Sequence, residues 1–212
     1  MTGRYDTTGN VEAQLEPGSN SRVLANKLGI TDPDEMDDIE LGLFYKLQGD
    51  VIGSVKADQP ITFADICEWH RSWPDNVYAW AGRYRTLNMG KGDFQLAASA
   101  QIPRLMDKLD NEILPVHTHC TGMSEEQLTE AIAVVHVELT LIHPFREGNG
   151  PLSRLLANVM ALQAGWPELD YTPWDDCKTD YIASIQAGMT DYGPMKILVR
   201  RVLRETARYA DA

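Results

Sequence analysis

One short segment gathers most of the side chains that could carry out chemistry. It reads HPFREGNGPLSR, from His143 to Arg154, and combines an imidazole, a carboxylate, an amide, two glycines and two arginines. An imidazole can take up a proton near neutral pH. A carboxylate can share Mg²⁺ with phosphate oxygens. Side chains of these types, so close together, favour phosphoryl or nucleotidyl transfer.

The backbone of the same segment is suited to an anion. The apolar helix before it is predicted to end at His143, because a residue before proline is disfavoured in a helix. A second helix is predicted to begin at Pro151, where the missing N–H costs no helical bond. Gly148 and Gly150 allow successive N–H groups to turn toward an anion. The start of the second helix adds unpaired N–H groups and the positive end of its dipole.

Four side chains of the segment have expected roles. Glu147 is placed to bind Mg²⁺ beside the anion site. Asn149 can donate its amide to a phosphoryl oxygen, and Arg154, one turn into the helix, can reach a terminal phosphate as a two-pronged donor. His143 is the candidate base.

Repeating apolar residues at helical spacing predict the elements that hold this segment. We expect an all-α bundle of seven or eight helices with one β-hairpin, whose turn lies at Asn88–Asp93. Residues 1–30 are expected to form an extended arm, and residues 31–212 a single helical domain with its core at about 60–200. The predicted helices begin at Pro33, Phe63, Ile102, Glu125 and Pro151 and at about residues 175 and 194.

Composition excludes several classes of partner. The net charge of −12 argues against a nucleic acid. The most apolar run, 131–142, is too short and too polar to span a bilayer. Three widely separated cysteines provide neither a disulfide framework nor a CxxC metal site. Without an apolar leader in MTGRYDTTGN, we expect a reducing, cytoplasmic location.

The segment resembles the signature of the Fic family, HPFx[D/E]GNGRxxR, at every specified position but one. VYAWAGRYRTLNMGKGDF resembles the family's hairpin flap, and KTDYIASIQAGMTDYGPM resembles the segment after its core. The resemblance implies a Fic-type helical fold. It also implies a protein adenylyltransferase, which moves AMP from ATP onto a Ser, Thr or Tyr hydroxyl of a target protein.

The resemblance also implies residue roles. His143 would deprotonate the target hydroxyl, Phe145 would anchor the loop, and Glu147 would bind Mg²⁺ on the phosphates. Arg154 would hold the distal phosphates, and Tyr181 would line the adenine pocket. The anion hole would be formed by Gly148, Asn149 and Gly150. The flap would align the target as an added strand, with Thr86, Leu87, Asn88, Lys91, Gly92 and Phe94.

Pro151 is the one departure, because the signature has arginine there. A missing charged hydrogen bond is typically worth ~1.5–3 kcal/mol, so ATP binding or the rate would fall ~10–100-fold unless another cation substitutes. Arg83, Arg85 and Lys91 are cations near the flap. The departure leaves open the transfer of another nucleotidyl or phosphoryl group, and a nucleotide-binding module without turnover.

Two further patterns bear on regulation and on chemistry. Thr8–Ala13 is the nearest match to the family's inhibitory [S/T]xxxE[G/N] pattern, but it fails at the last position. We therefore expect a separate antitoxin-like partner as the inhibitor. His136 and His143, with Glu147, would allow a metal-dependent hydrolase as a weaker alternative. A hydrogen-bonded core histidine is the favoured interpretation of His136.

Overall fold

The computed structural model describes residues 10–91 and 94–210. Within that part the chain is helical apart from one short hairpin, so the predicted architecture is confirmed. The hairpin strands are β1 (Gly90–Lys91) and β2 (Phe94–Gln95). The helices are α1 (Pro33–Ser54), α2 (Phe63–Ser72), α3 (Ile102–Lys108), α4 (Leu114–His117), α5 (Glu125–Ile142), α6 (Asn149–Gln163), α7 (Thr172–Asp176), α8 (Lys178–Ala187) and α9 (Gly193–Ala210).

Local capping signals account for where several helices begin. The Asp32 carboxylate accepts the N–H groups of Asp34 and Glu35 at the start of α1. Ser124 and Gln127 cap each other's backbone at the start of α5. Further along, the expected helix over about 175–188 is divided into α7 and α8 at Cys177.

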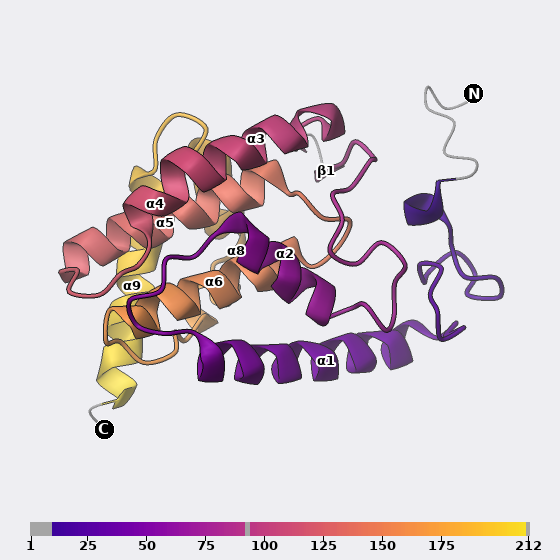
Figure 1. Cartoon of the computed structure of the whole chain (residues 1–212), viewed down its shortest axis with the longest axis horizontal. Helices are drawn as coiled ribbons and strands as arrows, with labels where there is room; N and C mark the ends of the chain where they lie inside the picture. Colours follow the sequence, from indigo (N-terminus) through magenta and orange to yellow (C-terminus); the bar gives the residue numbers. More distant parts are fainter. Residues whose placement is uncertain (1–9, 92–93, 211–212) are drawn as a thin grey trace.

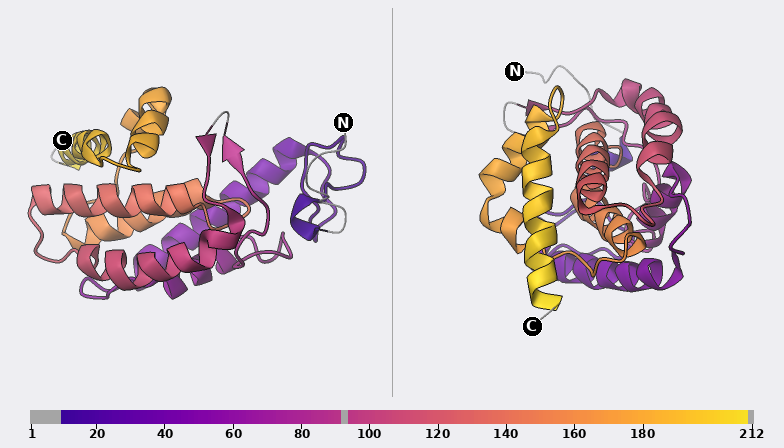
Figure 2. Two further views of the ribbon diagram at one scale, coloured as in Figure 1. Left: turned by 90° about the horizontal axis from the view of Figure 1, so that it is seen from above. Right: turned by 90° about the vertical axis from the view of Figure 1, so that its left-hand side faces the viewer.

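Helix α5 is the centre of the bundle. Figure 2 shows it enclosed by other helices when the molecule is seen from the end. It contacts α6, α9, α8, α4 and α3, and also the helical segment Leu109–Ile113 between α3 and α4. Burial extends to almost every side of it, since the seven consecutive residues from Ala131 to Val137, which span about two turns, are all buried. The C-terminal end of such a buried helix is a rigid base for a functional loop.

The N-terminal arm lies against the body, beyond one end of α1 (Figure 1). From residue 10 it forms a short 3₁₀ turn, Val11–Ala13, and a bridge between Leu15 and Leu24. Val23 and Ile30 join a small apolar cluster with Tyr78 and Trp80, separate from the main core. The arm is therefore packed on the segment that leads into the hairpin.

The hairpin is shorter than the flap that the sequence predicts. Gly90 pairs with Gln95 and Lys91 with Phe94 in antiparallel register. The pair projects from the helices where α5 ends, as the left view of Figure 2 shows. Among the described residues, no helix is both long and apolar enough to cross a membrane.

Candidate functional site

The signature loop connects α5 to α6 through two left-handed residues. His143 follows the last turn of α5 with φ of 51°, and Gly148 precedes α6 with φ of 82°. The second helix begins at Asn149, two residues earlier than predicted, so Pro151 is its third residue. The prediction that Pro151 is the first helical residue was therefore wrong by two positions. Its missing N–H still costs nothing, because the first four helical N–H groups have no intrahelical acceptor.

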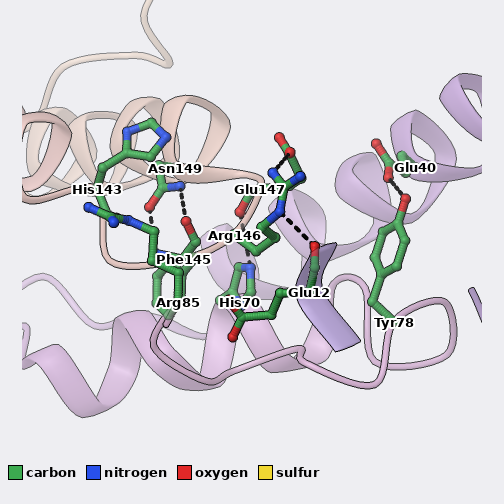
Figure 3. Close-up of polar contacts among 10 residues, drawn as sticks. All are labelled: Glu12, Glu40, His70, Tyr78, Arg85, His143, Phe145, Arg146, Glu147 and Asn149. Carbon is green, nitrogen blue, oxygen red and sulfur yellow. Dashed lines mark hydrogen bonds and ion pairs between the residues drawn. The ribbon is translucent and has the colours of Figure 1, made fainter. Parts of the chain in front are cut away.

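The interior of the loop is fixed by Phe145 and Asn149. Phe145 is 1% exposed and stacks on His70 at 3.9 Å between ring centroids. The Asn149 side chain accepts from Phe145 N (2.9 Å) and donates to Phe145 O (2.8 Å), as Figure 3 shows. We expected that amide to point at a phosphate. It closes the loop instead, because the backbone of Phe145 offers both a donor and an acceptor within its reach.

His70 supports the loop from α2, and the sequence analysis did not identify it. Its Nδ1 accepts the N–H of Gly82 (2.8 Å), so the ring proton lies on Nε2, which donates to the Glu147 carbonyl oxygen (3.2 Å). The ring is fully buried, and burial lowers the pKa of His70 to about 4. Nothing in the local sequence predicts this contact, because 77 positions separate the partners.

Acidification should therefore destabilise the protein. Burial also lowers the pKa of His136 to about 4. As pH falls below about 6.5 the unfolded chain takes up protons that the folded chain does not, so the free energy of unfolding decreases down to the folded pKa. Each histidine can remove roughly 3 kcal/mol over that range. We expect urea denaturation to show this decrease in the free energy of unfolding as pH falls. In His70→Gln the decrease should be about half as large, because one of the two buried histidines is gone. An identical pH slope in both proteins would contradict the assignment to His70.

Arg85 ties the end of α5 to the base of the flap. It is 1% exposed, and its guanidinium donates to the carbonyl oxygens of His143 (2.6 Å), Ala97 (2.6 Å), Ile142 (3.2 Å) and Leu87. It is thus not available to replace the cation missing at Pro151. These contacts hold His143 in a backbone conformation that is uncommon for residues other than glycine.

A cleft of about 400 Å³ opens between the loop, the flap and α8. From the predicted site it is lined by His143, Glu147, Gly148, Asn149, Gly150, Tyr181 and Phe94. The remaining flap residues Thr86, Leu87 and Asn88 lie outside this lining. Lys91 belongs to β1, while Gly92 lies outside the described residues.

The imidazole of His143 has a defined orientation. Its Nδ1 lies 3.3 Å from the carbonyl oxygen of Thr140, which can only accept. A proton on Nδ1 suits this contact. The residue lines the cleft with Thr140.

Glu147 is the loop carboxylate that lines the same cleft. Arg146 donates to its Oε1 and forms an ion pair with it. Partial desolvation raises the pKa of Glu147, although its side chain stays 50% exposed; Arg146 opposes this rise, and the neighbouring Glu40 carboxylate adds to it. A cation in the cleft would favour the charged form of this carboxylate.

Arg154 lies beside a second pocket of about 510 Å³, which shares Gly150, Pro151 and Tyr181 with the cleft. Its guanidinium makes two hydrogen bonds to Asp175 of α7 (2.6 and 3.1 Å) and lies over the ring of Tyr171. The sequence analysis did not foresee Asp175. A phosphate that binds Arg154 must share or displace that carboxylate.

His136 is a core residue, as expected. Its Nε2 contacts the Tyr181 hydroxyl (2.7 Å), and its Nδ1 contacts the carbonyl oxygen of Ser153 (3.3 Å). With both ring nitrogens engaged, it does not converge with His143 on a metal. The described residues also contain no group of three or more His, Cys, Asp or Glu side chains suited to a metal ion.

Comparison with known proteins identifies a family domain. Residues 60–161 match the Fic/DOC family. The chain is 28% identical to "Probable protein adenylyltransferase y4lH" of Sinorhizobium fredii, over 88% of this chain and 93% of that protein. It is 26% identical to "Protein adenylyltransferase VbhT" of Bartonella schoenbuchensis, over 86% of this chain but 37% of that protein.

Solved structures share the fold. The BepC protein of Bartonella tribocorum, solved with bound AMPPNP, superposes with a TM-score of 0.72 at 23% identity, covering 91% of this chain and 97% of that one. Fic-1 of C. elegans superposes with a TM-score of 0.64 at 25% identity, covering 87% of this chain and 55% of that one.

Proposed function

Residues 60–161 form a Fic/DOC family domain, and on that premise we propose that this protein is a protein adenylyltransferase. It would transfer AMP from ATP to a hydroxyl side chain of another protein. Relatives whose sequences align with most of this chain carry the name protein adenylyltransferase. One observation carries the proposal furthest: His143, Glu147 and the N-terminus of α6 face one cleft beside an antiparallel hairpin.

The proposed reaction starts at His143. Its imidazole takes the proton of the target hydroxyl, whose oxygen then bonds to the α-phosphorus of ATP. The bond between the α-phosphorus and the bridging oxygen breaks, and pyrophosphate leaves. Negative charge develops on the α-phosphate oxygens near the N–H groups of Asn149 and Gly150, the first two residues of α6. The Asn149 side chain contributes by closing the loop.

Mg²⁺ fits the donor set as a partner of ATP. It is commonly held by one or two carboxylates together with substrate phosphates, and Glu147 offers a carboxylate to the cleft. When bound, the ion would neutralise charge on the phosphates. Arg146 orients that carboxylate by holding Oε1.

The flap is the proposed docking edge for the target. β1 and β2 are short strands paired with each other, and an extended segment of the target could add to this pair through backbone hydrogen bonds. The hydroxyl to be modified would then lie over His143. Gly90 and Phe94 line the cleft, whereas Thr86, Leu87 and Asn88 lie at the base of the flap and hydrogen-bond to Glu12, Arg85 and Ser99.

The donor site differs from the family pattern in its cations. Pro151 replaces one arginine, and Arg154 is engaged with Asp175. Tyr181 borders both pockets, so the adenine can lie in the cleft while the distal phosphates extend toward Arg154. This arrangement also suits another nucleotidyl donor, so each nucleoside triphosphate has to be tested.

Mass measurement tests the function directly. The protein alone, and with cell lysate, is incubated with Mg²⁺ and each nucleoside triphosphate in turn, and intact masses are recorded. We expect a gain of one AMP from ATP on this protein or on a target. A gain of another nucleotidyl or phosphoryl group would change the donor, and no gain with measurable nucleotide binding would indicate a binding module.

Restoring the missing cation should raise activity. Pro151→Arg places a guanidinium at the start of α6, where arginine is a good helix former. We expect ATP affinity or the rate of AMP transfer to rise ~10-fold or more, the lower end of the range for a charged hydrogen bond. Pro151→Gln is the matched control without charge. Equal effects of the two substitutions in calorimetry and transfer assays would contradict a charge effect.

Regulation and location complete the proposal. In the family that the chain resembles, the inhibitory glutamate pairs with the second arginine of the signature, which is Arg154 here. Glu12 of the Thr8–Ala13 pattern contacts Thr86 instead, and Arg154 is paired with Asp175. A separate antitoxin-like protein therefore remains the proposed inhibitor. Cys67, Cys120 and Cys177 are free thiols, which suits a reducing compartment such as the cytoplasm.

A further inference from the structure

A short N-terminal turn lies against the base of the flap. Asn10 caps the turn Val11–Ala13 by accepting the N–H of Glu12 (3.0 Å). The same Asn10 side chain donates to the Thr86 hydroxyl (2.9 Å). This segment lies outside the part of the chain that matches the Fic/DOC family.

The Glu12 carboxylate is the main link between the turn and the flap. It is 7% exposed, and its Oε2 accepts from Thr86 N (2.9 Å) and from the Thr86 hydroxyl (3.3 Å). The hydroxyl can satisfy both neighbours, because it donates to Glu12 and accepts from Asn10. A buried carboxylate with these partners holds its own backbone in one place.

That backbone in turn holds Arg146 of the signature loop. The carbonyl oxygen of Glu12 accepts from Arg146 Nε (3.0 Å), and the other end of the guanidinium donates to Glu147. Figure 3 shows Arg146 between these two residues. The Arg146 side chain is 19% exposed, so its contact with the Glu12 carbonyl oxygen is partly shielded from water, whereas the Glu147 side chain is 50% exposed at the cleft end of the bridge.

Charge supports the same arrangement. Arg85, beside Thr86 in the chain, is buried among carbonyl oxygens. Burial lowers the pKa of Arg85, and the Glu12 carboxylate opposes this effect. Glu12 thus supplies negative charge near the buried guanidinium that links the flap to His143.

We propose that Glu12 is a positioning residue: through Thr86 and Arg146 it holds the flap base and directs the Glu147 carboxylate at the cleft. The positioning contacts do not depend on the proposed function. Their consequence does: by orienting Glu147, the arm would strengthen Mg²⁺-dependent nucleotide binding. The role is opposite to that of an inhibitory glutamate, which would compete with the nucleotide.

Hydrogen exchange in the absence of nucleotide and metal tests the contacts. Glu12→Ala should increase the exchange rate of the segments 84–89 and 144–148 by ~3-fold or more, while α9 stays protected. Glu16→Ala is the matched control, because within residues 10–91 and 94–210 the Glu16 carboxylate accepts from Asn26 of the same arm and makes no contact with the flap or the loop. Glu12→Gln retains an acceptor oxygen and should recover most of the protection. Unchanged exchange in Glu12→Ala would overturn the proposal.

Calorimetry tests the consequence without relying on turnover. ATP affinity is measured with and without Mg²⁺, and the ratio of the two affinities is compared between proteins. Loss of a residue that orients a metal ligand typically costs 10–100-fold in metal affinity, so we expect Glu12→Ala to reduce this ratio ~10-fold with ATP affinity in EDTA unchanged. An unchanged ratio, or a higher ATP affinity in the variant, would reject the positioning role. If the unaltered protein transfers no nucleotidyl group, the proposed function fails, but the positioning role of Glu12 is still decided by hydrogen exchange and by the affinity ratio.

Discussion

Replacing His143 with alanine is expected to abolish most AMP transfer while nucleotide binding persists. General-base catalysis contributes ~10²–10⁴-fold to rates, and His143, which lines the cleft, is the proposed base. The truncation removes no proposed phosphate contact, so ATP affinity should stay within about 3-fold, as for a group that acts mainly in the transition state. Transfer rates and calorimetry on the same samples give both quantities.

His119→Ala is the matched control for this experiment. His119 is exposed and lies just before α5, at the opposite end of that helix from the loop. It should retain full activity. If His143→Ala transferred AMP as fast as the unaltered protein, another group would have to be the base. A protein that never transfers AMP, yet binds ATP equally well in both forms, would be a binding module.

The second large effect concerns Gly148. A Cβ added there would lie 2.3 Å from a ring carbon of Trp73, at a backbone φ of 82°. Trp73 cannot move aside, because its Nε1 donates to the Glu40 carbonyl oxygen (2.8 Å) and its ring packs on Phe44. Overpacking costs about 1–3 kcal/mol, and a left-handed non-glycine residue adds about 1–2. Gly148→Ala should lose roughly 3 kcal/mol of unfolding free energy by urea denaturation.

Gly150→Ala separates this effect from a general need for glycine. A Cβ on Gly150 would meet no atom within 4 Å, and its φ is not positive. Because alanine is the better helix former, stability should stay equal or rise by up to about 1 kcal/mol. Its methyl group would instead enter the proposed phosphate site and weaken ATP binding. Equal destabilisation by both substitutions would refute the assigned difference.

These glycines show how far a motif can be interpreted. Both were predicted to turn N–H groups toward an anion. The structure assigns the left-handed conformation to Gly148, which packs on Trp73, and places Gly150 inside the first turn of α6. A one-dimensional pattern does not reveal which neighbour approaches the missing side chain.

The sequence by itself determined the elements and the position of the loop. Helical periodicity predicted α5, the Ser124–Gln127 pair predicted its start, and the proline after His143 predicted its end. These rules depend on residues within a few positions of each other. For the same reason the sequence also placed His143, Glu147 and the α6 N-terminus beside one another, and the cleft contains all of them.

Only the tertiary structure decided which partner each polar side chain takes. Arg154 binds Asp175, and Arg85 binds the carbonyl oxygens of Ile142 at the end of α5 and of Ala97 in the flap. His70 and Glu12 reached the loop from 77 and 134 positions away. Each of these groups has several possible donors or acceptors of similar intrinsic strength. The choice among them depends on which ones burial brings into range, and that is a property of the packed chain.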